Sequence, residues 1–146
     1  MLYRKAVDKD INYFIKFRKI LLGHEDDNSL DDTFFNYFLH ALNDKSLVAW
    51  IAEDDNAIIS TVCLSICQLV PRFDNPSGKI AYLSNVFTTP DYRRQGIASN
   101  LLREAVNDVL SQGIKKVLLH SSHMAKSIYE NIGFTEGKNY FVLKAP

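Results

Sequence analysis

Apolar residues recur along the chain at two different spacings, and these spacings predict a succession of helices and strands. Two early segments show the three-to-four-residue spacing of a helix with one buried face. In the first segment the spaced positions are Ile11, Phe14, Ile15, Phe17, Arg18, Leu21 and Leu22. In the second they are Phe34, Phe35, Tyr37, Phe38, Leu39 and Leu42. We expect Asp8 to cap the first helix and Gly23 to end it, while Asp31 and Asp32 precede the second.

Strands are predicted before and after these helices. Residues 2–6 read as a short first strand. Residues 47–53 and 57–70 read as two strands around a polar turn, which is the pattern of a hairpin. The segment 71–79 has the proline, asparagine and glycine content of an exposed loop, and it leads into a fourth strand at 80–88.

The second half of the chain alternates helix and strand. We expect a helix at 96–112, a strand at 116–120, a short helix at 124–131, and final strands around Phe134 and at 140–143. Neither a repeat nor a linker interrupts the chain. The order therefore predicts one domain over residues 1–146, of the α/β (α+β) class with a mixed sheet.

The composition excludes some classes of function. Of the 146 residues, 47% are hydrophobic and 23% are charged, as in ordinary globular domains. The 17 basic and 17 acidic residues cancel, so we expect no nucleic-acid partner held by broad neutralisation of phosphates. No run of about 18 apolar residues is present, and the start of the chain lacks the apolar centre of a signal peptide. We therefore expect no membrane partner and a cytoplasmic location.

Both cysteines, Cys63 and Cys67, lie in one predicted strand. Their separation along an extended strand is roughly 13 Å, which is too far for a disulfide. We therefore expect two buried thiols that pack in the core and take no part in catalysis.

The most specific chemistry lies in residues 82–103, where a strand ends at a proline and Gly96 opens an amphipathic helix. Backbone N–H groups in the first turn of a helix have no internal partner, so they can receive a phosphate oxygen. Gly96 allows close approach, and Ala98 is small enough to leave the site uncovered. Arg93 and Arg94 add positive charge that suits a pyrophosphate or a ribose phosphate. Taken alone, these residues fit a solvated basic turn at least as well as a phosphate site.

The same residues also fit a family signature. Residues 93–98 match the pattern arginine or glutamine, two residues, glycine, one residue, glycine or alanine, and Pro90 and Tyr92 are typical before it. Further along the chain, a second signature is matched by Ala125, Tyr129, Gly133 and Phe134. Over its whole length, the chain resembles the GCN5-related N-acetyltransferase (GNAT) family.

The resemblance implies a fold and a co-substrate. The fold is a mixed, mostly antiparallel central sheet of about six to seven strands flanked by about four helices, with the fourth and fifth strands splayed. Acetyl-CoA is expected in that opening. Its pyrophosphate would lie on the main chain of Arg94, Gln95, Gly96, Ile97, Ala98 and Ser99, with charge from Arg93. Its pantetheine arm would follow the main chain of Val86 and Thr88, with Phe87 between them, and a backbone N–H near Val86 or Phe87 would polarise the thioester carbonyl.

The resemblance also implies catalytic roles. Tyr129 lies one helical turn after Ala125 and is the candidate acid that protonates the departing thiolate. Many relatives carry a glutamate base on the fourth strand, where this chain has Ser84 and Asn85. Asn85 can hold a water but cannot take its proton, so the identity of the base stays open.

The base is left open between His120 and His123, because imidazole titrates near neutrality. No third ligand with convincing spacing accompanies these two histidines, so no metal is expected. Ser122 stands where relatives often have an asparagine that contacts pantetheine, and its hydroxyl is the expected replacement.

These residues lead to one hypothesis and one alternative. The hypothesis is an acetyl-CoA-dependent N-acetyltransferase. It would move an acetyl group to a primary amine of an unidentified small-molecule or peptide acceptor, by direct attack through a tetrahedral intermediate. The alternative is a non-catalytic coenzyme A-binding module, which the missing carboxylate base keeps open. A homodimer is expected only by analogy with similar proteins.

Overall fold

One mixed sheet organises the protein, which is described by a computed structural model of all residues from Met1 to Pro146. The sheet has five strands in the order β1–β2–β3–β4–β5. The strands are β1 (Leu2–Lys5), β2 (Leu47–Asp54), β3 (Ala57–Gln68), β4 (Lys79–Thr88) and β5 (Val117–Leu118). Each neighbouring pair is antiparallel except β4 and β5, which are parallel.

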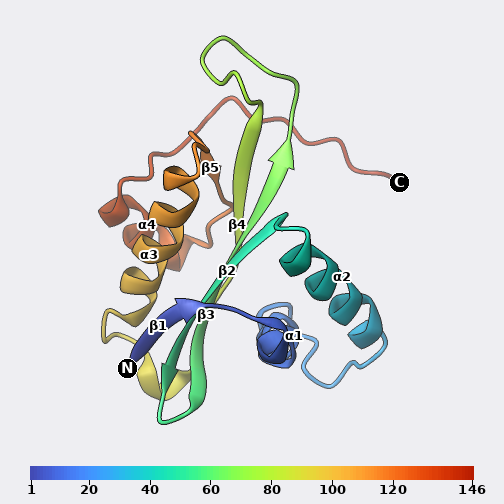
Figure 1. Cartoon of the computed structure of the whole chain (residues 1–146), viewed down its shortest axis with the longest axis vertical. Helices are drawn as coiled ribbons and strands as arrows, with labels where there is room; N and C mark the ends of the chain where they lie inside the picture. Colours follow the sequence, from blue (N-terminus) through green and yellow to red (C-terminus); the bar gives the residue numbers. More distant parts are fainter.

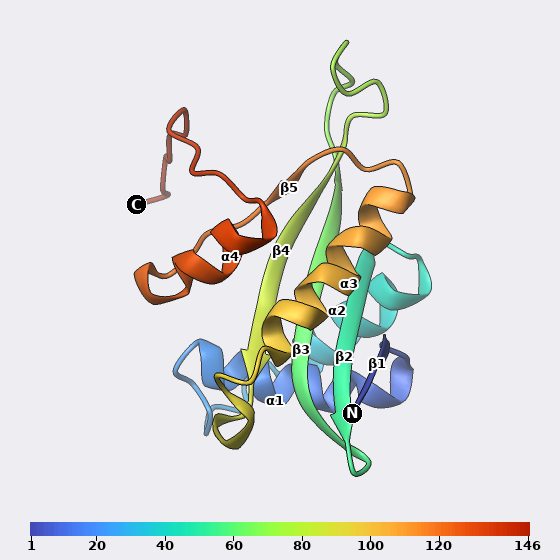
Figure 2. The same cartoon turned by 90° about the vertical axis from the view of Figure 1, so that its left-hand side faces the viewer.

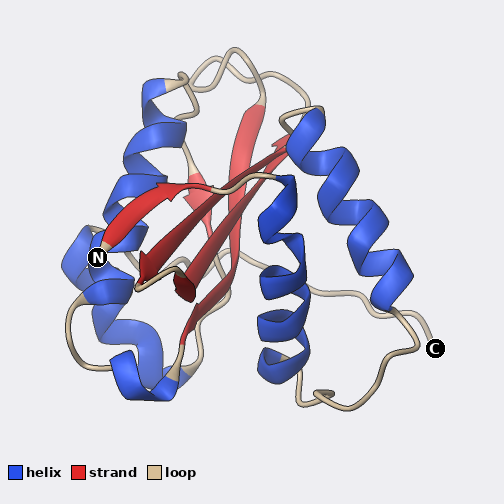
Figure 3. Cartoon of the chain, turned by 60° about the horizontal axis from the view of Figure 1, so that its bottom comes forward, coloured by secondary structure: helices blue, strands red, loops and turns tan.

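Two layers of helices cover the two faces of this sheet (Figures 1, 2 and 3). The helices are α1 (Ile11–Leu21), α2 (Asp31–Asn43), α3 (Ile97–Ser111) and α4 (Lys126–Ile132). Short 3-10 turns are formed by Asp8–Asp10, Pro90–Tyr92 and His123–Ala125. One buried cluster joins α1 and α2 to the sheet, and the other joins α3 and α4 to its opposite face. The layers agree with the helical spacing of apolar residues in the sequence.

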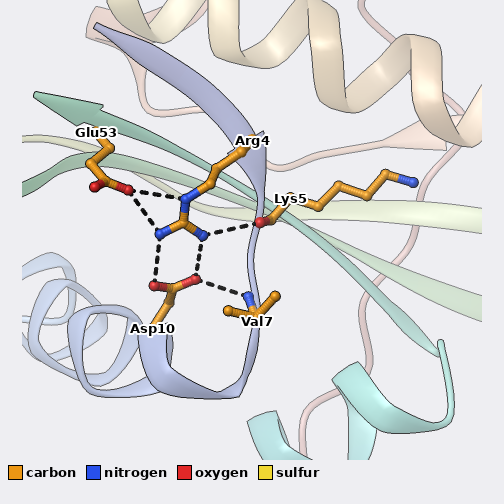
Figure 4. A network of polar contacts seen from close by, with 5 residues as sticks. All are labelled: Arg4, Lys5, Val7, Asp10 and Glu53. Atoms are coloured by element: carbon orange, nitrogen blue, oxygen red, sulfur yellow. Dashed lines mark hydrogen bonds and ion pairs between the residues drawn. The ribbon is translucent and has the colours of Figure 1, made fainter. Parts of the chain in front are cut away.

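A charged network fastens the start of α1 to the edge of the sheet (Figure 4). Arg4 donates to both carboxylate oxygens of Asp10, at 2.8 and 3.1 Å, and its Nε donates to Glu53 at 3.0 Å. The Val7 backbone N–H donates to Asp10 Oδ2 at 2.9 Å. The predicted cap at Asp8 is wrong, because α1 starts without a side-chain cap, and Asp8 instead accepts a bond from Asn43.

The last part of the chain differs from the expectation. Six to seven strands were expected, and the structure forms five, because residues 134–146 form no strand. The predicted strand at 116–120 shortens to Val117 and Leu118, which pair with Ala81 and Tyr82. An edge of this length offers too few backbone groups to align a further strand. The side chains of Phe141 and Leu143 are accordingly 97% and 99% exposed.

The two thiols lie in different surroundings. Cys63 is buried, as expected, whereas Cys67 is half-buried, and both are free. Burial raises the pKa of the Cys63 thiol, so this group stays protonated at neutral pH. None of the helices has the length and apolar character that crossing a membrane would require.

Candidate active site

Strand β4 loses one of its two neighbours halfway along its length. Only Ala81 and Tyr82 pair with β5, while the pairing with β3 continues to Thr88. From Leu83 onward, the backbone groups on the β5 side of β4 therefore have no strand partner. The expected divergence of the fourth and fifth strands is present, and it leaves a free strand edge beside the start of α3 (Figure 2).

A β-bulge interrupts β4 where the strands diverge. Ser84 lies opposite Cys63 and Phe87 lies opposite Thr61, so β4 holds one residue more than β3 in this interval. The extra residue is Asn85, whose φ of 55° lies in the left-handed region. Asparagine is one of the few side chains that tolerate this conformation.

Hydrogen bonds from β3 hold the bulge. Thr61 Oγ1 donates to the Asn85 carbonyl at 3.0 Å, and Ser60 Oγ donates to the Phe87 carbonyl at 2.7 Å. All four residues are buried. The two donors fix the path of β4 at the point where its free edge begins.

The Asn85 side chain points toward α1 and is only 5% exposed. Its Nδ2 lies 3.4 Å from the Phe14 carbonyl of α1, whereas its Oδ1 is buried without a hydrogen-bond partner. Two residues on, the Phe87 ring stacks on Phe17 of α1 at 4.3 Å. The bulge thus contacts α1 directly and buries one unpaired acceptor atom.

Backbone N–H groups collect at the start of α3. Arg94 and Gly96 have φ values of 59° and 78°, and the helix begins at Ile97 without a side-chain cap. None of the N–H groups of residues 94–99 donates a hydrogen bond within the chain. Consecutive free N–H groups at a helix start can hold an anion. These are the residues for which the sequence predicts pyrophosphate contacts.

The side chains of Arg93 and Gln95 form hydrogen bonds that stabilise this loop. Arg93 Nε donates to the Thr88 carbonyl at 2.9 Å, and its guanidinium lies 5.8 Å from the centre of the Phe87 ring. Gln95 Nε2 donates to the Asp91 carbonyl at 3.0 Å. Arg93 and Gln95 therefore shape the turn with their side chains, while the other guanidinium nitrogens of Arg93 stay free for an anion.

Tyr129 lies on α4 and packs against the apolar cluster formed with α3. Its ring meets Phe134 edge-to-face at 5.9 Å, and its hydroxyl makes no hydrogen bond within the chain. Burial raises the pKa of Tyr129, so the phenol is protonated at neutral pH. Tyr129 can consequently donate a proton.

His120 is held by two phenols, those of Tyr82 and Tyr140, that no motif in the sequence indicates. The Tyr82 hydroxyl lies 2.6 Å from Nδ1, and the Tyr140 hydroxyl lies 2.8 Å from Nε2. Whenever the imidazole is neutral, one of its nitrogens donates and the other accepts, so one phenol donates to the ring and the ring donates to the other phenol. His123 makes no comparable contact and lies in the short turn before α4.

Comparison with known proteins decides the family. The sequence profile of the acetyltransferase (GNAT) family matches residues 14–134, which is most of the chain. The chain belongs to the GNAT family.

Individual GNAT relatives agree with this assignment. N-alpha-acetyltransferase 30 of Schizosaccharomyces pombe is 30% identical over 110 residues, which cover 73% of this chain and 68% of the relative. N-acetyltransferase 8B of Rattus norvegicus is 31% identical over 104 residues, so the chain spans only 45% of that relative. A predicted acetyltransferase from Clostridium acetobutylicum, solved with acetyl-CoA, has a TM-score of 0.89 at 33% identity and matches over 98% of this chain and 95% of its own.

Within this GNAT fold, the predicted site residues fall on both faces of the sheet. Tyr129 packs with the α3 cluster on one face. Tyr82 shares the opposite face with its cross-strand partner Ser65, which lies 3.2 Å from the Tyr37 hydroxyl of α2. His120, bonded to Tyr82, therefore belongs to the α1–α2 face. Successive side chains of a strand point to opposite faces of the sheet, so the sequence of β4 could have identified Tyr82 as a residue of that face. No local pattern points to Tyr140.

The predicted pantetheine contact Ser122 lies just before the short turn at His123–Ala125. Ser122 is exposed, and its carbonyl accepts the Ala125 N–H, while its hydroxyl makes no contact within the chain. No three side chains of the ligand-forming types gather where they could hold a metal ion.

Proposed function

We propose that this GNAT chain transfers the acetyl group of acetyl-CoA to a primary amine. The observation that carries the proposal is the run of free N–H groups at residues 94–99, next to the unpaired edge of β4. Acetyl-CoA supplies an activated thioester, and the similar structure from Clostridium acetobutylicum was solved with it. The remaining steps are assigned to side chains and backbone groups of this chain.

Binding uses mainly backbone groups. The N–H groups of residues 94–99 receive the diphosphate oxygens, and the helix dipole of α3 together with Arg93 and Arg94 adds attraction. Main-chain groups of Val86 and Thr88, on the free edge of β4, hold the pantetheine arm, with Phe87 between them. A backbone N–H near Val86 or Phe87 donates to the thioester oxygen as it becomes negative. Ser122 offers a hydroxyl to the same arm.

Tyr129 acts as the acid. Its raised pKa keeps the phenol protonated, and its hydroxyl is free of internal bonds, so it can give a proton to the departing sulfur. The apolar contacts of its ring with Phe134 restrict the direction in which the hydroxyl points.

His120 acts as the base on the opposite face of the sheet. One of its ring nitrogens accepts a bond from a phenol, so a proton given to that phenol oxygen can pass on to the ring. Asn85 contributes by accepting a hydrogen bond from the amine or from a water that carries its proton. We favour His120 over His123 because only His120 is held at both nitrogens.

A thiol-release assay tests this function. The protein is mixed with acetyl-CoA and a panel of primary amines, and free thiol is followed with time. We expect turnover in the wild type and a fall in kcat of roughly 100-fold in Tyr129→Phe, with unchanged affinity for acetyl-CoA. Tyr13→Phe, which removes an exposed hydroxyl of α1, is the matched control and should leave kcat unchanged.

The same assay also distinguishes the acetyltransferase from the alternative function. Tight binding of acetyl-CoA without thiol release from any amine would favour a non-catalytic coenzyme A-binding module. Equal turnover by the wild type and Tyr129→Phe would remove the acid role from Tyr129. The cytoplasmic location and the homodimer stay predictions from the sequence.

A further inference from the structure

Arg18 occupies the middle of the face that α1 turns toward the sheet. It follows Ile11 by seven residues and Phe14 by four, so all three lie on one stripe of the helix. The side chains of Ile11 and Phe14 are 1% and 0% exposed, and Arg18 itself is half-buried. Figure 2 shows α1 crossing the sheet near the later half of β4. A cation therefore lies where the spacing of the helix calls for an apolar residue.

This cation has no partner within the chain. Arg18 takes part in none of the ion pairs, whereas the adjacent buried Lys19 donates a hydrogen bond to Asn28 at 2.6 Å and forms an ion pair with Asp31 at 3.1 Å. Arg4, the other inward-facing arginine, is bonded to Asp10 and Glu53. Partial burial of an unpaired charge costs free energy, and that cost is recovered when an anion binds.

The surroundings of Arg18 place it near the bulge of β4. Its positive charge acts on the Cys63 thiol and offsets part of the pKa rise that burial causes there. Cys63 is the cross-strand partner of Ser84, which precedes Asn85. On α1, the Phe14 carbonyl that meets Asn85 Nδ2 lies one helical turn before Arg18. Arg18 and Asn85 thus lie on the same side of the sheet. Asn85 contacts α1 at Phe14, one helical turn before Arg18.

The α1–α2 face therefore holds two groups without partners, the hydrogen-bond donors of Arg18 and the hydrogen-bond acceptor Oδ1 of Asn85. The guanidinium of Arg18 offers a planar fork of donors that matches a carboxylate, and the buried Oδ1 of Asn85 needs an N–H donor. A molecule that supplies both is an amine with a carboxylate group. A phosphate suits the place less well, because the next cation, Lys19, is already neutralised by Asp31.

We propose that the acceptor is a free amino acid, whose carboxylate binds Arg18 and whose amine donates a hydrogen bond to Asn85 Oδ1. This inference rests on the proposed acetyltransferase function and specifies its acceptor class. Arg18 is a residue of acceptor binding in this account, and it takes no part in moving protons.

Matched pairs of amines test the inference. The pairs are alanine with ethylamine, leucine with 3-methylbutylamine, and phenylalanine with phenethylamine, each differing by one carboxylate. We expect the wild type to acetylate the carboxylated member with the higher kcat/KM. In Arg18→Gln that value should fall roughly 100-fold, mainly through KM, because a charge-assisted bidentate contact is lost. The value for the decarboxylated member should change little.

The ratio within each pair is the decisive quantity, because intrinsic reactivity of the amines cancels when wild type and variant are compared. Arg18→Lys keeps the charge without the fork and should give an intermediate ratio. Lys16→Gln, two residues away on the exposed side of α1, is the control and should leave the ratio unchanged. The melting temperature of Arg18→Gln should equal or exceed that of the wild type, since an unpaired cation is removed.

Two results would overturn the inference while leaving the acetyltransferase function intact. One is a wild type that prefers the decarboxylated amines, and the other is an Arg18→Gln variant that slows both members of each pair equally. If no amine is acetylated, calorimetric titration of leucine and 3-methylbutylamine into the complex with coenzyme A decides. If leucine binds to the wild type and this binding is abolished in Arg18→Gln, the carboxylate site is supported. If leucine and 3-methylbutylamine bind equally well, or neither binds, the carboxylate site is refuted.

Discussion

The two faces of the sheet differ in the kind of group that each offers to a ligand. On the α3–α4 face, the available groups are mostly backbone: the N–H groups of residues 94–99 and the free edge of β4. On the α1–α2 face they are side chains, namely Arg18, Asn85, and the histidine held between Tyr82 and Tyr140. Backbone recognition needs only a few small residues, so it can be shared by a family, whereas side-chain recognition can change with each acceptor.

This comparison implies that each face can be damaged separately. A change at the start of α3 should remove coenzyme A without altering the α1–α2 face. Changes at Asp10 or Asn85 should alter stability or the acceptor face and leave coenzyme A bound.

The largest effect is expected at Gly96. Its φ of 78° strains any residue with a Cβ, although there is open space around it. In Gly96→Ala the turn should relax, so that the N–H groups of residues 94–99 no longer converge. Because charge-assisted hydrogen bonds are lost as a group, we expect the Kd for coenzyme A to rise about 100-fold in a calorimetric titration.

Gly23 provides a matched control for backbone strain. It has a φ of 72°, also has open space around it, and lies just after α1. Gly23→Ala should lower stability by a similar amount and leave the affinity for coenzyme A unchanged. An equal loss of affinity in both variants would mean that strain, and not the N–H groups of the α3 turn, governs binding.

The next largest effect is expected at Asp10, in the network of Figure 4. Asp10→Asn leaves Arg4 with Glu53 as its only carboxylate partner, and we expect a loss of about 2 kcal/mol of unfolding free energy at pH 7. Asp26→Asn, which changes an exposed carboxylate without such bonds, should have almost no effect. Coenzyme A binding should persist in both variants.

The pH dependence of the Asp10 effect has a definite sign. Burial raises the pKa of Asp10, but hydrogen bonds from Arg4 and Val7 outweigh it, and the pKa in the folded protein is lowered. The stabilisation is therefore complete above the unfolded pKa of about 4 and is lost as the pH falls through the folded pKa. Urea unfolding of wild type and Asp10→Asn should give curves that converge below about pH 4. A difference that grows on acidification would contradict this assignment.

The smallest effect is expected at Asn85. Its φ of 55° disfavours alanine, so Asn85→Ala should be less stable than Asn85→Gly by about 1 kcal/mol. Both variants remove the amide group. The difference between their thermal unfolding therefore reports the free-energy cost of the left-handed backbone conformation. If alanine were as stable as glycine here, the left-handed bulge would not persist in solution.

The sequence indicates the backbone groups at the start of α3 more directly than the side chains of the α1–α2 face. The glycine that opens α3 and the proline that ends β4 impose local geometry, so residues 94–99 could be proposed as a phosphate site without long-range information. The helical spacing also included Arg18, but its isolation could be found only after the positions of all carboxylates were known. The partnership of His120 with Tyr140 joins residues whose contact depends on the path of the whole tail.

The two errors have different physical origins. Asp8 was expected to cap the first helix, but the 3-10 turn at Asp8–Asp10 precedes α1, which starts without a side-chain cap, and the Asp10 carboxylate binds the Val7 N–H and Arg4. The apolar residues at 140–143 alternate poorly and have no template, because β5 pairs over only two positions. In the first case the deciding partners, Arg4 and Val7, are close in the sequence, whereas in the second the deciding feature is the short pairing of β5, which is distant from residues 140–143.

The most direct test of the central claim follows the backbone amide resonances of residues 94–99 by two-dimensional NMR during addition of coenzyme A. New hydrogen bonds to the diphosphate should shift these N–H protons strongly downfield, with smaller changes at Val86 and Thr88 and little change in α1. Binding that leaves the amides of residues 94–99 unshifted, or a complete absence of binding at millimolar coenzyme A, would contradict the account.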